Sequence, residues 1–299
     1  MSVSYVLRIA LAALLCSFAL QARAAITCTL TTTSVNLNYT NAQGTNANAS
    51  GTITVNCTRL STDPTSTTYW VSIDYGSRTG LSRRVFRHGG GTTNADRLDV
   101  SIYKSGTTTD WINANTGRVN GTLTFGAALS ASAVLTYDFR VGAGQTGNTA
   151  GIYDETFITS LQLTTAGAVV ATSSFTPTVS IVAQCFVGQV AAGNLAPGAV
   201  SPSTLTLNYT SFVATPQTAA MNFTVNCTRG TTYTLALSPT SGTLLGLNYT
   251  LALSSAGTTG DGLAQPYTVT GSIAASQAGT CSSGSCTATQ TGVTVTITY

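Results

Sequence analysis

The sequence predicts an all-β protein made of two β-sandwich domains in tandem. A seven-residue stretch occurs twice, as ITVNCTR at residues 53–59 and as FTVNCTR at residues 223–229. Each copy follows an Asn-Tyr-Thr triplet whose tyrosine lies 18 positions before the cysteine. The period of 170 residues is too long for a solenoid repeat, so it indicates two related domains. Short alternating runs between Gly-, Asn- and Ser-rich turns are typical of a β-sandwich.

The two copies of this heptamer are the best-defined strands of the sequence. Their apolar residues alternate with Thr or Asn, which is the period of a half-buried strand. Cys57 shares the parity of Ile53 and Val55, and Cys227 occupies the same place in the second copy. We therefore expect each cysteine to point into a core, where it can bridge to another strand.

The composition is that of a folded but weakly charged protein. Hydrophobic residues make up 43% of the 299 residues, which argues against disorder, whereas charged residues make up only 7%. Ordinary soluble domains contain about 25% charged residues. Neutral, Thr-rich strands suit an extracellular β-protein. Strand edges that lack charge also favour association between chains, a property that a polymerising protein would use.

The N-terminal segment 1–24 is predicted to be a signal peptide. Arg8 precedes a short apolar core at 9–20, and Ala22-Arg23-Ala24 provides the small-residue cleavage site. Without this segment, ten basic and nine acidic residues remain, which lacks the basic excess of a nucleic-acid-binding protein. No later stretch is long enough to span a membrane. We expect a soluble, exported mature protein.

The cysteines support export, because six of the seven lie after the signal peptide. Each domain has one cysteine at its start and one in its heptamer. This repetition predicts the disulfides Cys28–Cys57 and Cys185–Cys227, and the last two cysteines are left to form Cys281–Cys286. A zinc site is not expected, since the chain has one histidine and no paired CxxC motif.

Alternating segments mark the strands of each domain. In the first domain, 25–172, we expect strands at residues 31–39, 53–59, 69–75, 98–103, 123–125, 135–141 and 157–163. In the second domain, 185–299, we expect them at residues 205–209, 223–229, 233–237, 247–253, 267–273 and 293–299. The last strand carries its apolar residues on one face, namely Val293, Val295, Ile297 and Tyr299. A terminal strand of this kind usually has a pairing partner.

Between the domains, residues 173–184 form another alternating segment. Phe175, Val179 and Ile181 share one parity, and Pro177 restricts such a strand to a sheet edge or to a position where its nitrogen faces away. The segment is either a linker or an extra strand that lies between the domains.

The first domain combines four features: the cysteine and heptamer pattern, Leu98-x-x-x-Ile102-Tyr103, the Trp111 that follows, and Gly151-Ile152-Tyr153-Asp154 before a strand. In these features it resembles the spore coat protein U domain, the subunit type of archaic chaperone–usher pili. The resemblance covers nearly all of residues 25–172. The second domain matches in its heptamer and terminal strand but lacks the tryptophan. In it, 278–281 replaces the Gly-x-Tyr-Asp part, so it is a shorter, diverged copy.

The resemblance implies immunoglobulin-like sandwiches, of which the C-terminal one is an incomplete pilin sandwich that lacks its last strand. In this family a periplasmic chaperone supplies that strand, and an adjacent pilus subunit replaces it in the fibre, after passage through an outer-membrane usher. We expect 173–184, through Phe175, Val179 and Ile181, to complete the first domain internally. The second domain would stay open at its 293–299 strand.

These expectations lead to a functional prediction. Only three residues lie between the predicted cleavage site and Cys28, too few for a donor strand, and tip adhesins have two domains. We therefore predict a tip subunit on a cell-surface pilus that mediates attachment to abiotic or host surfaces and biofilm formation. The alternatives are a mid-fibre pilin, if cleavage occurs earlier, and a secreted carbohydrate-binding module (lectin). With one histidine and no Gly-x-Ser-x-Gly elbow, we expect neither enzymatic activity nor a cofactor.

Two stretches are candidates for adhesive loops. The first is the basic cluster that contains Arg83, Arg84 and Arg87, for which internal ion pairing is the alternative interpretation. The second is the weakly polar stretch 126–134 around Ala128 and Leu129, which is either an exposed binding loop or a packed connection between strands.

Overall fold

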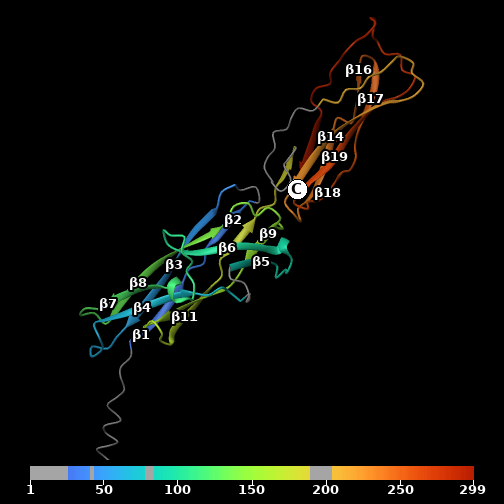
Figure 1. The fold of residues 1–299 in the computed structure, drawn as a ribbon. Coiled ribbons are helices and arrows are strands. Elements are labelled where there is room, and N and C mark those ends of the chain that lie inside the picture. The colour runs from blue at the N-terminus through green and yellow to red at the C-terminus, as the bar shows by residue number, and fades with distance from the viewer. Residues whose placement is uncertain (1–25, 41–43, 78–83, 189–203) are drawn as a thin grey trace, which may run out of the picture.

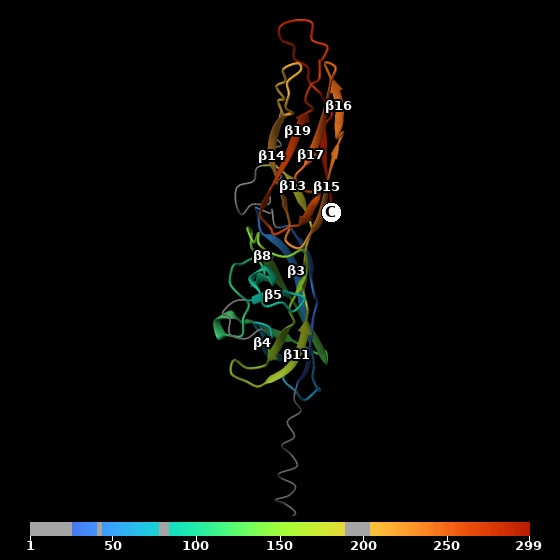
Figure 2. The same ribbon diagram turned by 90° about the vertical axis from the view of Figure 1, so that its right-hand side faces the viewer.

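The computed structural model describes residues 26–40, 44–77, 84–188 and 204–299 (Figure 1). The predicted signal peptide and Arg83 lie outside these residues. Two β-sandwiches follow one another along a long axis, as both ribbon views show (Figures 1 and 2). The described helices are two short 3-10 turns, η1 (Asn94–Asp96) and η2 (Asn115–Gly117). No helix within these residues is long and apolar enough to cross a membrane.

The N-terminal sandwich packs an eight-stranded sheet on a four-stranded sheet. The first has the order β1-β3-β8-β6-β5-β9-β12-β2, and the second has the order β11-β10-β4-β7. Its strands are β1 (Thr27–Thr32), β2 (Asn36–Tyr39), β3 (Ala47–Thr58), β4 (Ser66–Ile73), β5 (Arg84–His88), β6 (Arg97–Lys104), β7 (Val119–Thr124), β8 (Ser130–Val141), β9 (Gly151–Asp154), β10 (Phe157–Gln162), β11 (Val169–Phe175) and β12 (Thr178–Ile181).

The core of this sandwich is one continuous cluster of apolar side chains from both sheets. Trp111 is fully buried in it, and its indole nitrogen donates a 2.9 Å hydrogen bond to the carbonyl of Val71. Phe86 packs against Phe139 and Phe157, with ring centroids 5.4 and 5.9 Å apart. The apolar residues that alternate in the sequence therefore do face one interior, as strand periodicity requires.

The C-terminal sandwich packs a five-stranded sheet, β13-β14-β19-β17-β16, on a three-stranded sheet, β18-β15-β20. Its strands are β13 (Cys185–Val187), β14 (Gln217–Cys227), β15 (Thr232–Ser238), β16 (Ser241–Leu244), β17 (Leu247–Leu253), β18 (Gly257–Thr259), β19 (Ala264–Ile273) and β20 (Thr294–Thr298). The buried residues form two small clusters rather than one. The all-β, two-sandwich fold predicted from the sequence is confirmed.

All three predicted disulfides are formed. Cys28 lies opposite Cys57 in the β1–β3 ladder, and Cys185 lies opposite Cys227 in the β13–β14 ladder. The third bridge, Cys281–Cys286, closes a short loop. In the chain-entropy view, the first two bridges each stabilise their sandwich by about 4 kcal/mol. They fix the heptamer strand of each repeat to the strand that enters its sheet.

Two predicted strands differ from the structure. The expected strand 31–39 is split into β1 and β2, because the chain leaves the β3 ladder after Thr32 and joins β12 from Asn36 onward. Residues 205–209 have the predicted alternation but belong to no strand. A segment is a strand only when another strand pairs with it, and 205–209 has no such partner among the described residues.

Candidate functional site

The segment around Pro177 completes the N-terminal sandwich. β11 pairs with β10, placing Phe175 opposite Phe157. After Pro177 the chain changes sheets, and β12 lies between β9 and β2, with Val179 opposite Tyr153 on one side and opposite Leu37 on the other. Because proline has no N–H to donate, it suits this crossing point between two ladders. One continuous segment therefore supplies strands to both sheets.

The side chains of this segment belong to the core. Phe175, Val179 and Ile181 are almost completely buried. The ring of Phe175 lies 5.6 Å from that of Phe157 and 5.5 Å from that of Tyr137. Large apolar side chains such as these each stabilise a fold by about 1.5–3 kcal/mol when buried. The segment is thus an integral part of the N-terminal sandwich and not a linker.

In its described residues, the C-terminal sandwich contains a counterpart of β10 but no counterpart of β11. β20 pairs with β15, just as β10 pairs with β4, and Leu235 lies opposite Ile297. Among the residues that the structure describes, no strand pairs with the second edge of β20. Val295 and Ile297 are half-buried against the core, whereas Val293 and Tyr299, beyond the strand ends, are exposed.

The counterpart of β2 is also unpaired within the described residues. Residues 204–210 carry Leu205, Leu207 and Tyr209. These side chains pack against one of the two small clusters, which consists of Tyr249, Leu251, Val269 and Ile273. In the N-terminal sandwich the equivalent strand β2 pairs with β12. Within the described part of the chain, 204–210 has no such partner. We call the surface formed by β20 and 204–210 the open edge of the C-terminal sandwich.

A tyrosine–glutamine contact holds 204–210 in place despite the missing strand. The Tyr209 hydroxyl donates to the carbonyl of Gln277 and accepts from its N–H, at 3.2 and 2.7 Å. The Gln277 side chain bonds both the N–H and the carbonyl of Asn248. This keeps the open edge ordered.

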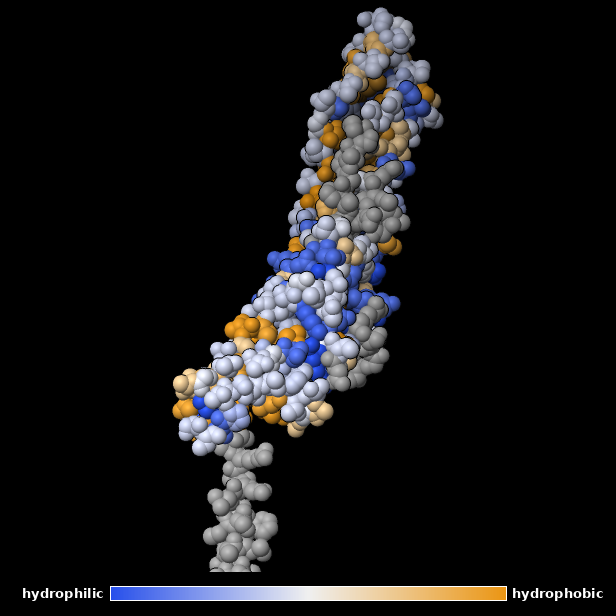
Figure 3. Space-filling model, turned by 60° about the vertical axis from the view of Figure 1, so that its left-hand side comes forward, coloured by the Kyte–Doolittle hydropathy of each residue, from blue (hydrophilic) through white to orange (hydrophobic). Residues whose placement is uncertain are grey.

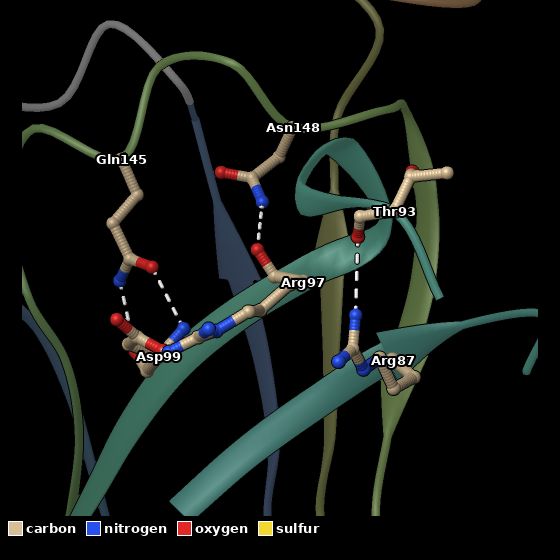
Figure 4. Close-up of polar contacts among 6 residues, drawn as sticks. All are labelled: Arg87, Thr93, Arg97, Asp99, Gln145 and Asn148. Carbon is tan, nitrogen blue, oxygen red and sulfur yellow. Dashed lines mark hydrogen bonds and ion pairs between the residues drawn. The ribbon is translucent and has the colours of Figure 1, made fainter. Parts of the chain in front are cut away.

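The N-terminal sandwich contains the same arrangement. Tyr39 bonds Gly142 and Gln145, and the Gln145 side chain bonds the N–H and the carbonyl of Asp99 (Figure 4). Sequence reasoning missed this second internal repeat, VGAGQ at 141–145 and IAASQ at 273–277. Its spacing of 132 residues differs from the 170 of the heptamers because the second sandwich is shorter.

The predicted basic adhesive cluster is corrected by the structure. Arg84 is only 3% exposed, and its guanidinium donates to the carbonyls of Asp74, Ile73 and Trp111. Burial lowers the pKa of Arg84 to about 10, so it stays charged at neutral pH. Arg84 is therefore a core residue that joins β5 to neighbouring segments, and it is not available to a ligand.

The rest of this cluster forms a folded polar network (Figure 4). Arg87 is half-buried and donates a 3.1 Å hydrogen bond to the carbonyl of Thr93. Arg97 forms an ion pair with Asp99 at 3.0 Å. Internal ion pairing, the alternative interpretation of this region, is therefore seen for Arg97 and Asp99, whereas Arg84 and Arg87 bond backbone carbonyls.

The second candidate loop lies on the surface. Ala128 and Leu129 are in the turn between β7 and β8, at the end of the N-terminal sandwich that points away from the C-terminal one. Leu129 is 53% exposed and lies beside Leu60, which is 60% exposed, because the carbonyl of Leu129 accepts the N–H of Arg59. Figure 3 shows apolar surface at this end. We call loops 60–65 and 126–130 the distal pole.

Arg59 holds the distal pole together, a role that its position in the heptamer did not reveal. It is buried, and its guanidinium donates to the carbonyls of Ala128 and Gly126 in one loop, at 3.2 and 2.9 Å. It also donates to those of Leu60 and Asp63 in the other loop, at 3.1 and 3.0 Å. One side chain thereby fixes both loops.

These features define a class of protein: a disulfide-bonded, tandem immunoglobulin-like β-sandwich protein whose first sandwich is self-completed and whose second has an open edge. Residues 14–160 match the family model described as the Spore Coat Protein U domain. Most of the N-terminal sandwich therefore matches the spore coat protein U domain, which confirms the resemblance seen in the sequence. No curated protein matches the chain.

Solved structures that are similar to this chain include three fimbrial proteins. AggA, the major subunit of aggregative adherence fimbriae type I from Escherichia coli, is 14% identical, with a TM-score of 0.30 over 53% of this chain and 95% of AggA. The CupB6 tip adhesin from Pseudomonas aeruginosa is 9% identical, with a TM-score of 0.34 over 54% of this chain and 43% of CupB6. CfaE, the adhesive subunit of CFA/I fimbria of enterotoxigenic Escherichia coli, is 11% identical, with a TM-score of 0.29 over 80% of this chain and 86% of CfaE.

Proposed function

We propose that this protein is the adhesive tip subunit of a chaperone–usher pilus and that it accepts a β-strand at the open edge of its C-terminal sandwich. The observation that carries the proposal is the contrast between two equivalent strands. β10 pairs with β4 on one side and with β11 on the other, whereas β20 pairs with β15 alone among the described residues. A sheet edge with unpaired N–H and carbonyl groups is a template for another strand.

The strand that fills the open edge should resemble β11 and β12. Those strands insert Phe175, Val179 and Ile181, which alternate along one continuous segment, between the two edges of the N-terminal sandwich. An equivalent donor would join the two small clusters of the C-terminal core. During export a periplasmic chaperone supplies this donor, and after passage through the outer-membrane usher the adjacent subunit replaces it.

The N-terminal sandwich is suited to the binding end of the fibre. It is complete without a donor, and its distal pole exposes Leu60 and Leu129 away from the C-terminal sandwich. Exposed apolar side chains held by a buried arginine form a contact surface of defined shape. We propose that this pole attaches the pilus to abiotic or host surfaces and supports biofilm formation.

Co-expression with the chaperone of the same pilus system tests strand acceptance. We expect the mature chain to purify as a one-to-one complex. Expressed alone, it should be recovered in much lower yield, as the fraction that escapes aggregation and proteolysis. The substitution Ile297→Asp should abolish the complex, because it places a charge on the face of β20 that joins the core. The matched change Thr296→Asp, on the exposed face, should preserve it. Recovery of the chain without the chaperone in the same yield as with it contradicts the proposal.

A second experiment tests adhesion through the distal pole. The double substitution Leu60→Ser/Leu129→Ser should reduce attachment of piliated cells to a hydrophobic surface by roughly tenfold, because two exposed apolar contacts are lost. Val134→Ser is the matched control, since Val134 is 63% exposed and lies further along β8, outside the distal pole. Equal attachment by the double variant and the control would show that another surface binds.

A further inference from the structure

We propose that the outer end of the C-terminal sandwich is a docking surface for the body of the same subunit that donates the strand, with Phe212 as its apolar anchor. We call this surface the outer pole and define it by residues 210–213, 245–246 and 276–280. The proposal rests on the proposed function and adds a second contact to it, separate from the open edge.

The two sandwiches of the chain meet through a small backbone joint. The N–H of Ala150 donates to the carbonyl of Arg229 at 2.9 Å, and Thr149 forms a parallel bridge with Arg229. On the other side, the N–H of Thr228 donates to the carbonyl of Gln184 at 2.8 Å. Gly230 has a φ of 80° and a Cβ there would lie 2.9 Å from Thr149, so glycine permits this close approach.

The outer pole repeats the half of this joint that belongs to the N-terminal sandwich. In that sandwich the N–H of Thr149 donates to the carbonyl of Ala95 at 2.9 Å. In the C-terminal sandwich the N–H of Thr280 donates to the carbonyl of Leu245 at 2.7 Å. Each threonine follows the glutamine of its Tyr–Gln contact by three or four residues. Thr280 therefore corresponds to Thr149, which receives the next sandwich of the chain.

The direction of the donor strand leads to the same surface. β12 ends at Ile181, and Gln184 then contacts Thr228 of the following sandwich. A donor that pairs with β20 as β11 pairs with β10 is antiparallel to β20. Because β20 runs toward the joint, where the C-terminus lies (Figure 1), this donor runs toward the outer pole. The body that follows the donor must then emerge beside residues 210–213 and 276–280.

Among the described residues, Phe212 makes no contact that would favour an aromatic side chain. It is 71% exposed and has a φ of 60°, a left-handed conformation that costs energy for a bulky residue. Its N–H bonds the carbonyl of Gln277 at 2.9 Å, an interaction that any residue but proline could make. Exposed aromatic residues are characteristic anchors of protein–protein contacts.

The chemistry of the partner follows from the outer pole. From Cys185 to the C-terminus the only charged side chains are Arg229 and Asp261, and both lie near the joint. The surface thus offers an aromatic ring and backbone groups without charge. It fits a subunit that presents the backbone of a strand-end loop, as the Thr228-Arg229-Gly230 loop of this chain does at the joint, and an apolar contact for the ring.

Release of the chain from assembled pili tests this inference. The substitution Phe212→Asn removes the ring and keeps a residue that tolerates a positive φ. We expect this variant and the unmodified chain to have the same urea midpoint of unfolding. In urea below that midpoint, the variant should nevertheless be released from purified pili at least about tenfold faster. Phe212→Tyr should restore retention. Leu263→Asn is the matched control, because Leu263 is an exposed apolar residue at the other end of the same sandwich.

Two outcomes overturn the inference: equal release of Phe212→Asn and the unmodified chain, or a parallel loss of stability in the free variant, which would assign Phe212 to the fold. If the unmodified chain is never found in pili, the proposed function itself fails. If the inference alone fails, the pili do contain the chain, and they release it at the same rate whichever residue stands at position 212.

Discussion

Arg59 and Arg229 end the two copies of the heptamer but serve different contacts. The Arg59 guanidinium is surrounded by carbonyls from the two loops of the distal pole and lies 5.8 Å from the centroid of Phe125. Arg229 instead contributes its backbone to the joint between the sandwiches. The same sequence position therefore organises a free surface in one domain and a covered one in the other.

Replacing Arg59 should loosen the distal pole. Arg59→Met leaves several buried carbonyls without a donor, so we expect the free energy of unfolding to fall by about 2–3 kcal/mol. Urea unfolding followed by tryptophan fluorescence measures this directly, because both tryptophans, Trp70 and Trp111, lie in the N-terminal sandwich.

The matched control is Arg118→Met. Arg118 also donates to carbonyls, those of Asn113 and Thr165, but it does so at the surface. We expect a change within about 0.5 kcal/mol for this variant. Equal losses in the two variants would show that burial of the Arg59 network contributes nothing.

Burial of a charged residue could not be predicted from the sequence. Arg84 stands in a Gly- and Arg-rich stretch that has the composition of a loop, and nothing in its spacing indicates a strand. Its position depends on β5 pairing with β6 and β9, and on carbonyls that become available only when the chain folds. Conversely, the buried parity of Cys57 and Cys227 follows from their own strands alone, and both disulfides were predicted correctly.

At the scale of elements, β12 shows what a donor strand contributes. Ile181→Ala should destabilise the N-terminal sandwich by about 2–4 kcal/mol, because the side chain is almost fully buried between the two sheets. Val182→Ala, one residue further along and half-exposed, should change stability by less than about 1 kcal/mol. Tryptophan fluorescence in urea distinguishes them. Similar small losses would mean that β12 is not essential to the sandwich.

Alternation predicted most strands, but it could not say which of them are paired. Residues 205–209 and Asn36–Tyr39 have the same pattern, yet only the second is a strand, because β12 lies beside it. β5 and β9 were missed because they are short and depend on neighbours distant in the sequence. Pairing is a property of the fold, so it became visible only in the structure.

At the scale of the whole molecule, one plan is used twice with different completion. Both sandwiches have the disulfide, the heptamer strand and the Tyr–Gln contact. The first contains its own last strands, and the second presents β20 and 204–210 without them in the described residues. The sequence predicted this asymmetry through the segment 173–184. The Tyr–Gln repeat and the joint at Arg229 required the coordinates.

Hydrogen exchange of β20 tests the central claim most directly, with β10 as an internal reference. In the complex with the chaperone, amides of β20 that do not bond β15 should exchange at least about tenfold more slowly than in the free chain, because a donor strand now covers them. Amides of β10 should be unchanged, since β11 already covers that edge. If β20 is as protected as β10 in the free chain, or if its exchange is the same with and without the chaperone, the C-terminal sandwich does not accept a strand.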